Sequence, residues 1–324
     1  MKTLEELRTF YETVLIDDLT VLEKKRKAVV KKVLISAAAI STAVLAVAGI
    51  LLVFLQGEDL MFLVFPVVIG VMGIHFAVGR LSRNYVSSFK QSIISSLVTF
   101  VDPDLQYDPQ AYIPVDLFKS SELFRRRIDR YRGDDLVWGR VGETAIRFSE
   151  LHAEYKTTTT DSKGRRKTHW HTIFKGLFFI GDFNKPINGQ TFVLPDTAER
   201  IFGSYGQIFQ SYNKTFGELI RLEDPDFEKE FVVYGTDQIE ARYILTTSLM
   251  ARITDFRRKA GKRIYLAFIG SNLFIAISFS RNLFEPRLFK TVLDFSPVQE
   301  YFEDMRLAVG IVEELNLNTR IWNR

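Results

Sequence analysis

The chain has 324 residues, a net charge of +4 and no cysteine. The absence of cysteine excludes disulfide bonds, thiol catalysis and thiolate metal sites. With 47% hydrophobic and 25% charged residues, the chain has room for a membrane anchor beside one large or two small soluble domains. The positive charge is modest and does not indicate a nucleic-acid partner.

Residues 1–32 are predicted to form an amphipathic helix. This segment contains no Gly or Pro, and its apolar residues recur at spacings of three and four, which is the period of a helix with one buried face. We expect the helix to run unbroken into the segment that follows. The apolar positions are Leu4, Leu7, Tyr11, Leu15, Leu19 and Leu22.

Two uncharged runs follow, at residues 33–55 and 60–79. Each is about 20 residues long, enough for a helix rising 1.5 Å per residue to cross a hydrocarbon core of roughly 30 Å. Residues 56–59 are too few to do more than turn the chain. The sequence therefore predicts two antiparallel transmembrane helices. Small residues on each run predict close helix contact: Ala38, Thr42 and Ala46 on the first, Gly70, Gly73 and Ala77 on the second.

Basic residues flank the two runs at their outer ends, whereas the turn between them carries only acidic charges. By the positive-inside rule, both termini are predicted to lie in the cytoplasm, with the protein in the inner (cytoplasmic) membrane. The same cations are candidate membrane-surface residues for anionic lipid, each contributing about 1 kcal/mol near an acidic leaflet; alternatively, they only set the topology. They are Lys24, Lys25, Arg26, Lys27, Lys31, Lys32, Arg80 and Arg83.

Residues 80–101 are predicted to continue the second helix into the cytoplasm. Leu81, Tyr85, Phe89, Ile93 and Leu97 repeat every four residues. Because the hairpin makes this arm a neighbour of residues 1–32, we expect the two apolar stripes to face one another as a helical stalk, in the manner of an antiparallel coiled coil. The alternatives are that one arm docks on the soluble domain or that arms pair between protomers.

Residues 102–324 are predicted to form a soluble cytoplasmic α+β domain with a largely antiparallel sheet. Alternating and β-branched residues indicate strands, and periodic stretches with capping residues indicate helices. The expected strands are 135–138, 145–158, 167–183, 190–194, 219–222 and 231–234. The expected helices are 117–128, which carries Arg125, Arg126 and Arg127, then 196–202, 237–259 with Asp237 as its N-cap and Gly261 at its end, and 297–315. Residues 264–279 are favoured as a buried β-hairpin over a third transmembrane helix.

The strands 145–158 and 167–183 should pair as a long hairpin that turns at residues 162–164. Its tip is polar and basic, which is typical of an exposed segment. Residues 188–189, Asn and Gly, are expected to turn the chain into the next strand. The tip is a candidate partner-binding surface through Lys163, Arg165, Arg166 and Lys167.

The same hairpin holds the one constellation that resembles a metal site. Residues two apart share a face of a strand, so Glu150 and Glu154 form one row with His152, and His169 and His171 form another. We expect Glu154 to lie opposite His171. Imidazoles and carboxylates can ligate zinc or another divalent ion, and Glu150, Glu154, His169 and His171 are the metal candidates. The favoured alternative is cross-strand polar pairs on a solvated face.

Five short motifs follow one another along the chain: residues 148–151 (Phe-Ser-Glu-Leu), 174–179 (Phe-Lys-Gly-Leu-Phe-Phe), 182–185 (Asp-Phe-Asn-Lys), 241–245 (Ala-Arg-Tyr-Ile-Leu) and 283–286 (Leu-Phe-Glu-Pro). Together they resemble the bacterial membrane-protein family catalogued as domain of unknown function 3137. The resemblance spans nearly the whole chain. It implies a membrane location and this architecture, suggests a LemA-like membrane protein as a partner, and supplies no catalytic residues.

The sequence contains no phosphate-binding loop, dinucleotide fingerprint or Gly-x-Ser-x-Gly elbow, and we predict no cofactor. We therefore expect a membrane-anchored binding or scaffolding module rather than an enzyme. One alternative is a membrane-tethered, metal-dependent enzyme that uses the 150–171 hairpin. Another is an adaptor that responds to anionic lipid.

Overall fold

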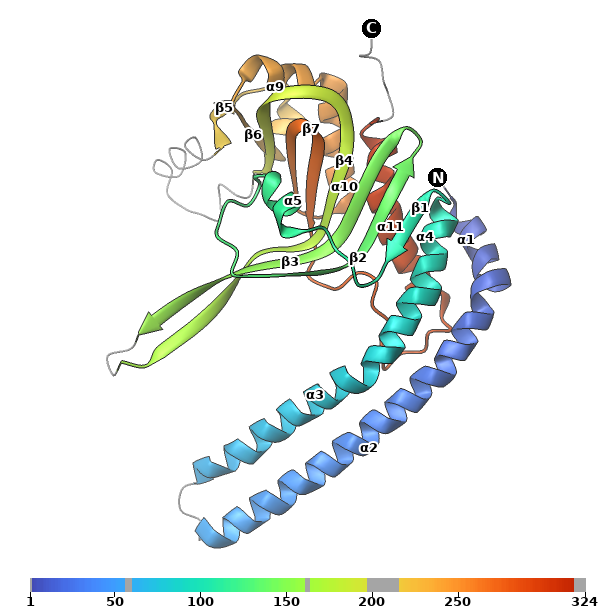
Figure 1. Ribbon diagram of the computed structural model, residues 1–324, viewed down its shortest axis with the longest axis vertical. Helices are drawn as coiled ribbons and strands as arrows, with labels where there is room; N and C mark the ends of the chain where they lie inside the picture. Colours follow the sequence, from blue (N-terminus) through green and yellow to red (C-terminus); the bar gives the residue numbers. More distant parts are fainter. Residues whose placement is uncertain (1, 56–59, 161–163, 197–215, 318–324) are drawn as a thin grey trace. The chain divides into compact units, whose positions relative to one another are not determined.

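The computed structural model describes residues 2–55, 60–160, 164–196 and 216–317 (Figure 1). These residues divide into two compact units. Unit 1 comprises residues 97–283 and 302–317, and unit 2 comprises residues 2–96 and 284–301. The predicted turns at 56–59 and 162–163, the predicted helix at 196–202 except its first residue, and the tail at 318–324 lie outside the described residues.

Two long helical segments dominate unit 2. The first consists of α1 (Leu4–Phe10), the π-helical turn η1 (Tyr11–Leu15) and α2 (Ile16–Leu55). The second consists of η2 (Leu60–Leu63), α3 (Val64–Phe89), η3 (Lys90–Ile94) and α4 (Ser95–Val101), the last of which runs into unit 1. The predicted extension of both helices beyond their apolar runs is therefore confirmed.

Both segments contain a stretch long and apolar enough to cross a membrane, by length and composition. Large apolar side chains in these stretches face outward, among them Val53, which is 77% exposed, and Phe54, which is 80% exposed. A soluble helix would bury such side chains.

Helices α2 and α3 approach each other closely at Gly70. A Cβ atom added there would lie 2.5 Å from a methyl group of Val44, so the predicted role of the glycine is confirmed. On α2, however, the contact is made by Ile40 and Val44. The predicted face of Ala38, Thr42 and Ala46 is exposed, because bulky residues on one helix already fit the groove that glycines leave on the other.

Beyond the apolar stretches, the two helical arms lie side by side. The hydroxyl of Ser92 donates to Asp18 over 2.7 Å. A third segment, residues 284–301, packs on both arms: Tyr301 contacts Phe89 with ring centroids 5.7 Å apart, and Phe295 contacts Tyr11 at 5.4 Å. The two arms are therefore neighbours, as the sequence predicts, and a distant segment that the sequence does not place there completes their packing.

Unit 1 is built on an antiparallel seven-stranded sheet in the order β1-β2-β3-β4-β6-β5, with β7 also paired to β4 (Figure 1). The predicted antiparallel sheet is confirmed. Its strands are β1 (Leu105–Asp108), β2 (Arg130–Val141), β3 (Thr144–Thr160), β4 (Arg166–Pro195), β5 (Glu218–Ile220), β6 (Phe231–Gly235) and β7 (Ile264–Ser278).

Strand β4 is the centre of the sheet and is longer than predicted. It pairs with β3 along residues 166–181 and with β6 along residues 191–195. Residues 264–278, assigned to the one strand β7, fold back on themselves at Gly270, because the backbone N–H of Ser278 donates to the carbonyl of Arg263 at 3.0 Å. The expected β-hairpin is therefore confirmed, and the alternative of a third transmembrane helix is wrong. Strand β4 bends around this hairpin between Asp182 and Gln190, pairing with residues 272–278 before the bend and with residues 266–269 after it, so the chain turns close to the predicted position at residues 188–189.

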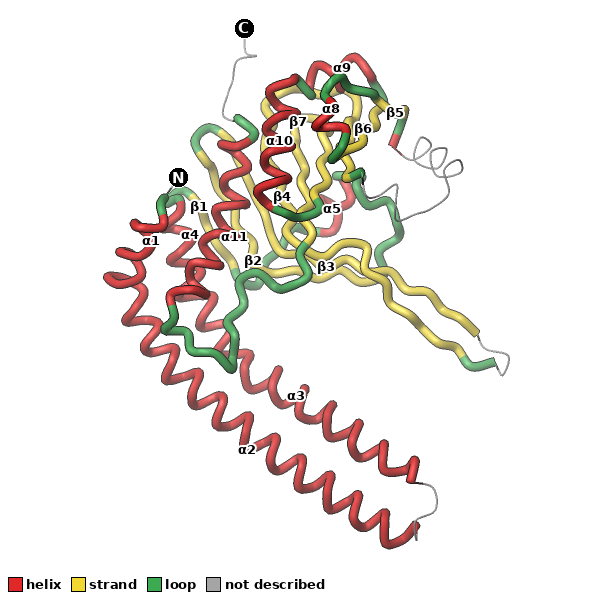
Figure 2. The backbone as a smooth tube through the Cα atoms, turned by 180° about the vertical axis from the view of Figure 1, so that it is seen from behind, coloured by secondary structure: helices red, strands yellow, loops and turns green. Residues whose placement is uncertain are grey.

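Besides the end of α4, the helices of unit 1 among the described residues are α5 (Val115–Ser120), α8 (Pro225–Glu228), α9 (Gln238–Ile244), α10 (Thr247–Ala260) and the second part of α11 (Phe295–Glu314). Figure 2 shows α10 lying across one face of the sheet. Asp237 caps α9 as predicted, accepting hydrogen bonds from the backbone of Ile239 and Glu240.

Two predicted helices differ from the structure. The single helix at 237–259 is broken at the buried Leu245, whose backbone is not helical, and Thr246 then caps α10. Residues 121–129 are not helical either, because Glu122 adopts a left-handed conformation at φ +52° that ends α5. Arg125, Arg126 and Arg127 therefore lie on a connecting segment.

Candidate functional site

Strands β3 and β4 extend beyond the rest of the sheet as a two-stranded ribbon (Figures 1 and 2). We define the ribbon as residues 155–160 and 164–172. The pairing of β2 with β3 ends at Arg130 and Glu154, and the pairing of β7 with β4 begins only at Ser278 and Gly176. Within the described residues, the two ribbon strands therefore pair only with each other.

Gly176 marks the point where β7 joins β4. Its φ of +149° is rarely adopted by other residues, and a Cβ atom there would lie 2.0 Å from the carbonyl oxygen of Ile277. Only glycine lets the two backbones approach this closely. The position therefore fixes where the flat sheet ends and the ribbon begins.

The ribbon carries positive charge. Residues 155–172 contain five Lys and Arg residues and one Asp. Three of the four predicted partner-binding residues, Arg165, Arg166 and Lys167, are exposed. Lys163 lies outside the described residues. These side chains form an exposed cationic surface.

Arginines from neighbouring segments stack on the aromatic rings at the base of the ribbon. The guanidinium carbon of Arg126 lies 3.7 Å from the ring centroid of Tyr155, and that of Arg130 lies 3.7 Å from the ring of Trp170. The ring of His171 stacks on Tyr155 at 4.8 Å. Such cation–π contacts contribute about 0.5–2 kcal/mol each, so the base of the ribbon is held in place.

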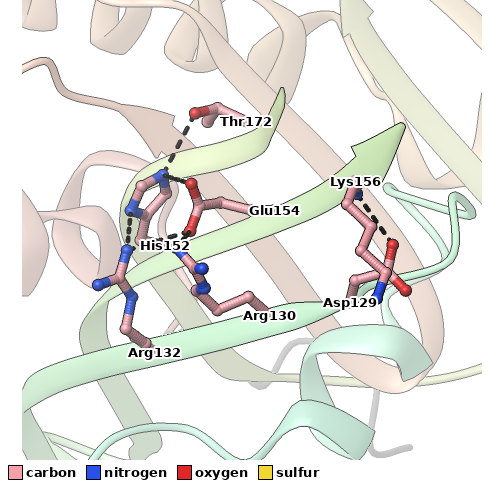
Figure 3. A network of polar contacts seen from close by, with 7 residues as sticks. All are labelled: Asp129, Arg130, Arg132, His152, Glu154, Lys156 and Thr172. Carbon is pink, nitrogen blue, oxygen red and sulfur yellow. Dashed lines mark hydrogen bonds and ion pairs between the residues drawn. The ribbon is translucent and has the colours of Figure 1, made fainter. Parts of the chain in front are cut away.

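A polar network connects the ribbon base to β2 (Figure 3). Glu154 accepts hydrogen bonds from Arg132 at 3.0 Å and from Arg130 at 3.3 Å. The Nε2 atom of His152 lies 3.2 Å from the hydroxyl of Thr172. Partial burial, with further help from nearby Arg and Lys charges, lowers the pKa of His152 below its usual range, which favours a neutral imidazole at pH 7.

The outer edge of β3 is closed beside this network. The carboxylate of Asp129 accepts a hydrogen bond from the backbone N–H of Lys156 at 2.9 Å (Figure 3). Capping an edge N–H with a side chain prevents further strand pairing at that point. The open part of the ribbon therefore begins beyond Lys156.

The four metal candidates lie in separate environments. Glu154 is held by the two arginines, and Glu150 is buried and accepts a hydrogen bond from the backbone of Leu283 at 2.8 Å. His171 lies 2.8 Å from the hydroxyl of Thr157, and His169 is exposed.

The predicted pairing of Glu154 with His171 is wrong. A register shift between Ala153 and Glu154 places Thr172 opposite Glu154 and Tyr155 opposite His171. A bulge of this kind changes which residues share a face of the ribbon.

Among the described residues, one other group could ligate a metal ion: Asp134, Asp135 and Glu150, whose ligand atoms lie within 4.8 Å of one another. Asp135 accepts a hydrogen bond from the hydroxyl of Tyr107. Burial, together with the nearby carboxylate of Asp135, raises the pKa of Tyr107 well above its usual range. These contacts give the group a structural role that links β1, β2 and β3.

The cations beside the apolar stretches differ in their surroundings. Arg26 is only 9% exposed and is paired with Glu23, so its side chain does not form part of a free membrane surface. The sequence does not reveal this burial, because the carbonyl of Leu288, which also accepts a hydrogen bond from Arg26, is distant in the chain. The remaining predicted membrane-surface residues are exposed: Lys24, Lys25, Lys27, Lys31, Lys32, Arg80 and Arg83.

Two arginines of β2 contribute to the ribbon base, and the sequence shows their alternating spacing. Arg130 and Arg132 alternate on one face of β2, opposite Glu154 and His152. Strand β2 begins at Arg130, five residues before the predicted start at residue 135, so the predicted strand does not include these arginines.

The fold defines an α+β protein that combines two long apolar helices with an antiparallel sheet. The family model described as "Protein of unknown function (DUF3137)" matches residues 172–317, which confirms the family resemblance over that segment. The chain is also similar to the crystal structure of the mycobacterial trehalose monomycolate transport factor A, TtfA. That likeness has a TM-score of 0.31 and 9% identity, and it covers 66% of this chain and 93% of that chain. A likeness of this size supports no conclusion about function. No curated protein matches the chain.

Proposed function

We propose that the protein is a membrane-anchored binding or scaffolding module with two spans and both termini in the cytoplasm. The outward-facing apolar side chains of α2 and α3 support the anchor. Exposing apolar surface to water costs about 25 cal/mol per Å², and a bilayer removes that cost. The exposed cations at the outer ends of both apolar stretches support the orientation.

The ribbon is the proposed binding surface. The observation that carries this proposal is its exposed cationic surface, held at its base by Arg126 and Arg130. A surface that is fixed in advance loses less conformational entropy on binding. Binding is favoured over catalysis because the carboxylates and His152 at the ribbon base already serve as partners of one another and of arginines.

The charge of the ribbon selects for a partner with an acidic surface. A membrane protein of the LemA-like kind, which the family resemblance implies, is the proposed partner class. Such a partner would be confined to the same membrane, and this confinement raises its effective concentration near the ribbon.

Site-specific photo-crosslinking in intact membranes tests the proposal. A photoreactive residue at Thr158 on the ribbon is expected to give a discrete protein adduct. The same residue at Ile239, which is 82% exposed on α9, is the matched control and should not give that adduct. Replacing Arg165, Arg166 and Lys167 together by Glu should abolish the adduct from Thr158. Equal adducts from both positions would contradict the proposed binding surface.

A further inference from the structure

Residues 284–294, which we call the strap, cross both arms of unit 2 and reverse direction as they do so. The strap begins beside the second arm, where Glu285 lies 3.9 Å from the ammonium of Lys90. It then reaches the first arm, where the carbonyl of Leu288 accepts a hydrogen bond from Arg26 at 2.9 Å. The strap is thus anchored at both arms by charged side chains.

The rest of the strap runs back along the first arm. The backbone N–H of Val292 donates to Glu23 at 3.2 Å, and the carbonyl of Leu293 accepts a hydrogen bond from the hydroxyl of Tyr11. The order of contacts, first Arg26, then Glu23 and then Tyr11, leads away from the apolar stretch of α2.

These contacts place the turn of the strap nearest to the apolar stretches. Arg26 precedes the predicted start of the first span, Val33, by about 10 Å of helix at 1.5 Å per residue. By the same measure, Lys90 lies about 16 Å beyond the end of the second span, and Tyr11 lies about 33 Å before the first. Residues 287–290 therefore form the tip of the strap on the side of the proposed membrane.

The chemistry of this tip is that of a membrane interface. Phe289 is 65% exposed. It is flanked by Arg287, whose side chain is 50% exposed and pairs with Glu300, and by the exposed Lys290. Aromatic rings gather at the headgroup level of bilayers, and neighbouring cations gain free energy from anionic lipid.

We propose that the strap tip is a lipid-binding site, in which the ring of Phe289 enters the headgroup region and Arg287 and Lys290 contact acidic phospholipid. This inference rests on the membrane anchoring proposed above. The headgroup region is about 5–8 Å thick on each side of the core, so a side chain reaching from the height of Arg26 meets it. The site continues the row of exposed cations at Lys27, Lys31 and Lys32, which favours an anionic bilayer as the occupant.

The absence of cysteine from the chain allows a direct test with single cysteines in the full-length protein. The variants F289C, L293C and V53C are each labelled with a polarity-sensitive fluorophore and placed in nanodiscs that contain phosphatidylglycerol. Lipids carrying a spin label near the headgroup or deep in the acyl chain serve as quenchers. Leu293 is the matched control because it lies on the same strap at the end far from the proposed membrane.

We expect the headgroup-level quencher to reduce the fluorescence of the label at 289 and to leave the label at 293 unchanged. The lipid quenchers should also reduce the fluorescence at 53, which lies about 3 Å inside the far end of the first span at 1.5 Å per residue. Quenching at 289 should decrease when phosphatidylglycerol is replaced by phosphatidylcholine, and also when Lys290→Gln is added.

The outcomes separate this inference from the proposed function. If the label at 53 is quenched and the labels at 289 and 293 respond alike, the protein is anchored and the lipid site at the strap tip is disproved. Equal quenching at 289 in phosphatidylglycerol and phosphatidylcholine would disprove the role of Arg287 and Lys290. If the label at 53 is not quenched, the anchoring fails and the inference falls with it.

Discussion

Arg26 and Glu23 form a buried ion pair on α2, with 2.7 Å between Nη2 and Oε1. Each side chain also binds the backbone of the strap, Arg26 at Leu288 and Glu23 at Val292. The pair therefore joins a helix near the N-terminus to a segment more than 260 residues away in the sequence. We therefore expect the packing of unit 2 to depend on the contacts of this ion pair with the strap.

We predict that Glu23→Ala lowers the free energy of unfolding of unit 2 by about 3–5 kcal/mol, because it leaves the charge of Arg26 buried without its partner. Denaturant unfolding of the full chain in detergent micelles measures this effect. Lys24→Ala, at an exposed neighbouring position, should change the free energy by less than about 0.5 kcal/mol. Equal effects of the two substitutions would refute the role of the pair.

Replacing both partners should be less harmful than replacing one. The double variant Glu23→Leu with Arg26→Met removes both charges and keeps apolar volume, and such replacements of buried pairs are often nearly neutral. We expect it to retain more stability than Glu23→Ala in the same unfolding experiment. A double variant as unstable as the single one would show that the hydrogen bonds to the strap dominate, rather than the unpaired charge.

Unit 2 should also lose stability in acid. Hydrogen bonds from Arg26, supported by the backbone N–H of Val292, lower the pKa of Glu23 from 4.5 to about 2. Because the folded pKa lies below the unfolded one, the stabilisation is fully present above pH 4.5 and is lost as the pH falls toward 2. Unfolding measured across this range should show a smaller pH dependence in Glu23→Gln than in the unchanged protein. Parallel pH profiles would argue against this assignment.

At the base of the ribbon, Arg130 and Trp170 are predicted to stabilise each other. A double-mutant cycle of Arg130→Ala and Trp170→Ala should give a coupling free energy of about 0.5–2 kcal/mol. Hydrogen exchange of the amides of residues 166–172 provides the measurement, since loosening of the ribbon is local. The exposed Lys167, paired with Trp170 in a second cycle, should give a coupling near zero.

Gly176→Ala should destabilise the sheet by about 3 kcal/mol or more, because the new methyl group meets the backbone of Ile277 and the residue must keep an unfavourable φ. Thermal unfolding measures the loss. Gly164→Ala is the control: its φ is also positive, at +75°, but no atom lies within 4 Å of an added Cβ. A loss at Gly176 no greater than at Gly164 would mean that strain alone, without the close approach of β7, accounts for the effect.

The sequence predicts the long helices and the antiparallel sheet because each follows from a local pattern. The runs 33–55 and 60–79 are uncharged, and the strand segments alternate. The burial of the Arg26–Glu23 pair cannot be predicted in the same way, since Leu288, which binds Arg26, and Val292, which binds Glu23, lie in a segment without helical or strand periodicity. The turn expected at residues 188–189 falls within the bend of β4 between Asp182 and Gln190, because Asn and Gly are a local turn signal that the sequence shows directly.

The sequence predicts the ribbon as a basic hairpin, but it does not predict the register of the two strands. A single bulge beside Ala153 exchanges the residues that face each other beyond it, and no local sequence signal fixes its position. Consequently, Glu150, Glu154 and His171 each contact different partners, and His169 is exposed. Arg130 and Arg132 instead take the positions around Glu154.

Alkaline extraction of membranes tests whether the full chain is anchored in the bilayer. The protein is expressed beside a variant in which Leu45 and Val71, both outward-facing residues near the centres of the apolar stretches, are replaced by Arg. We predict that the unchanged protein stays in the membrane pellet, whereas the variant is released, because a charge at the centre of a span costs about 2.5–3.5 kcal/mol. Release of the unchanged protein into the soluble fraction would contradict a membrane-anchored module.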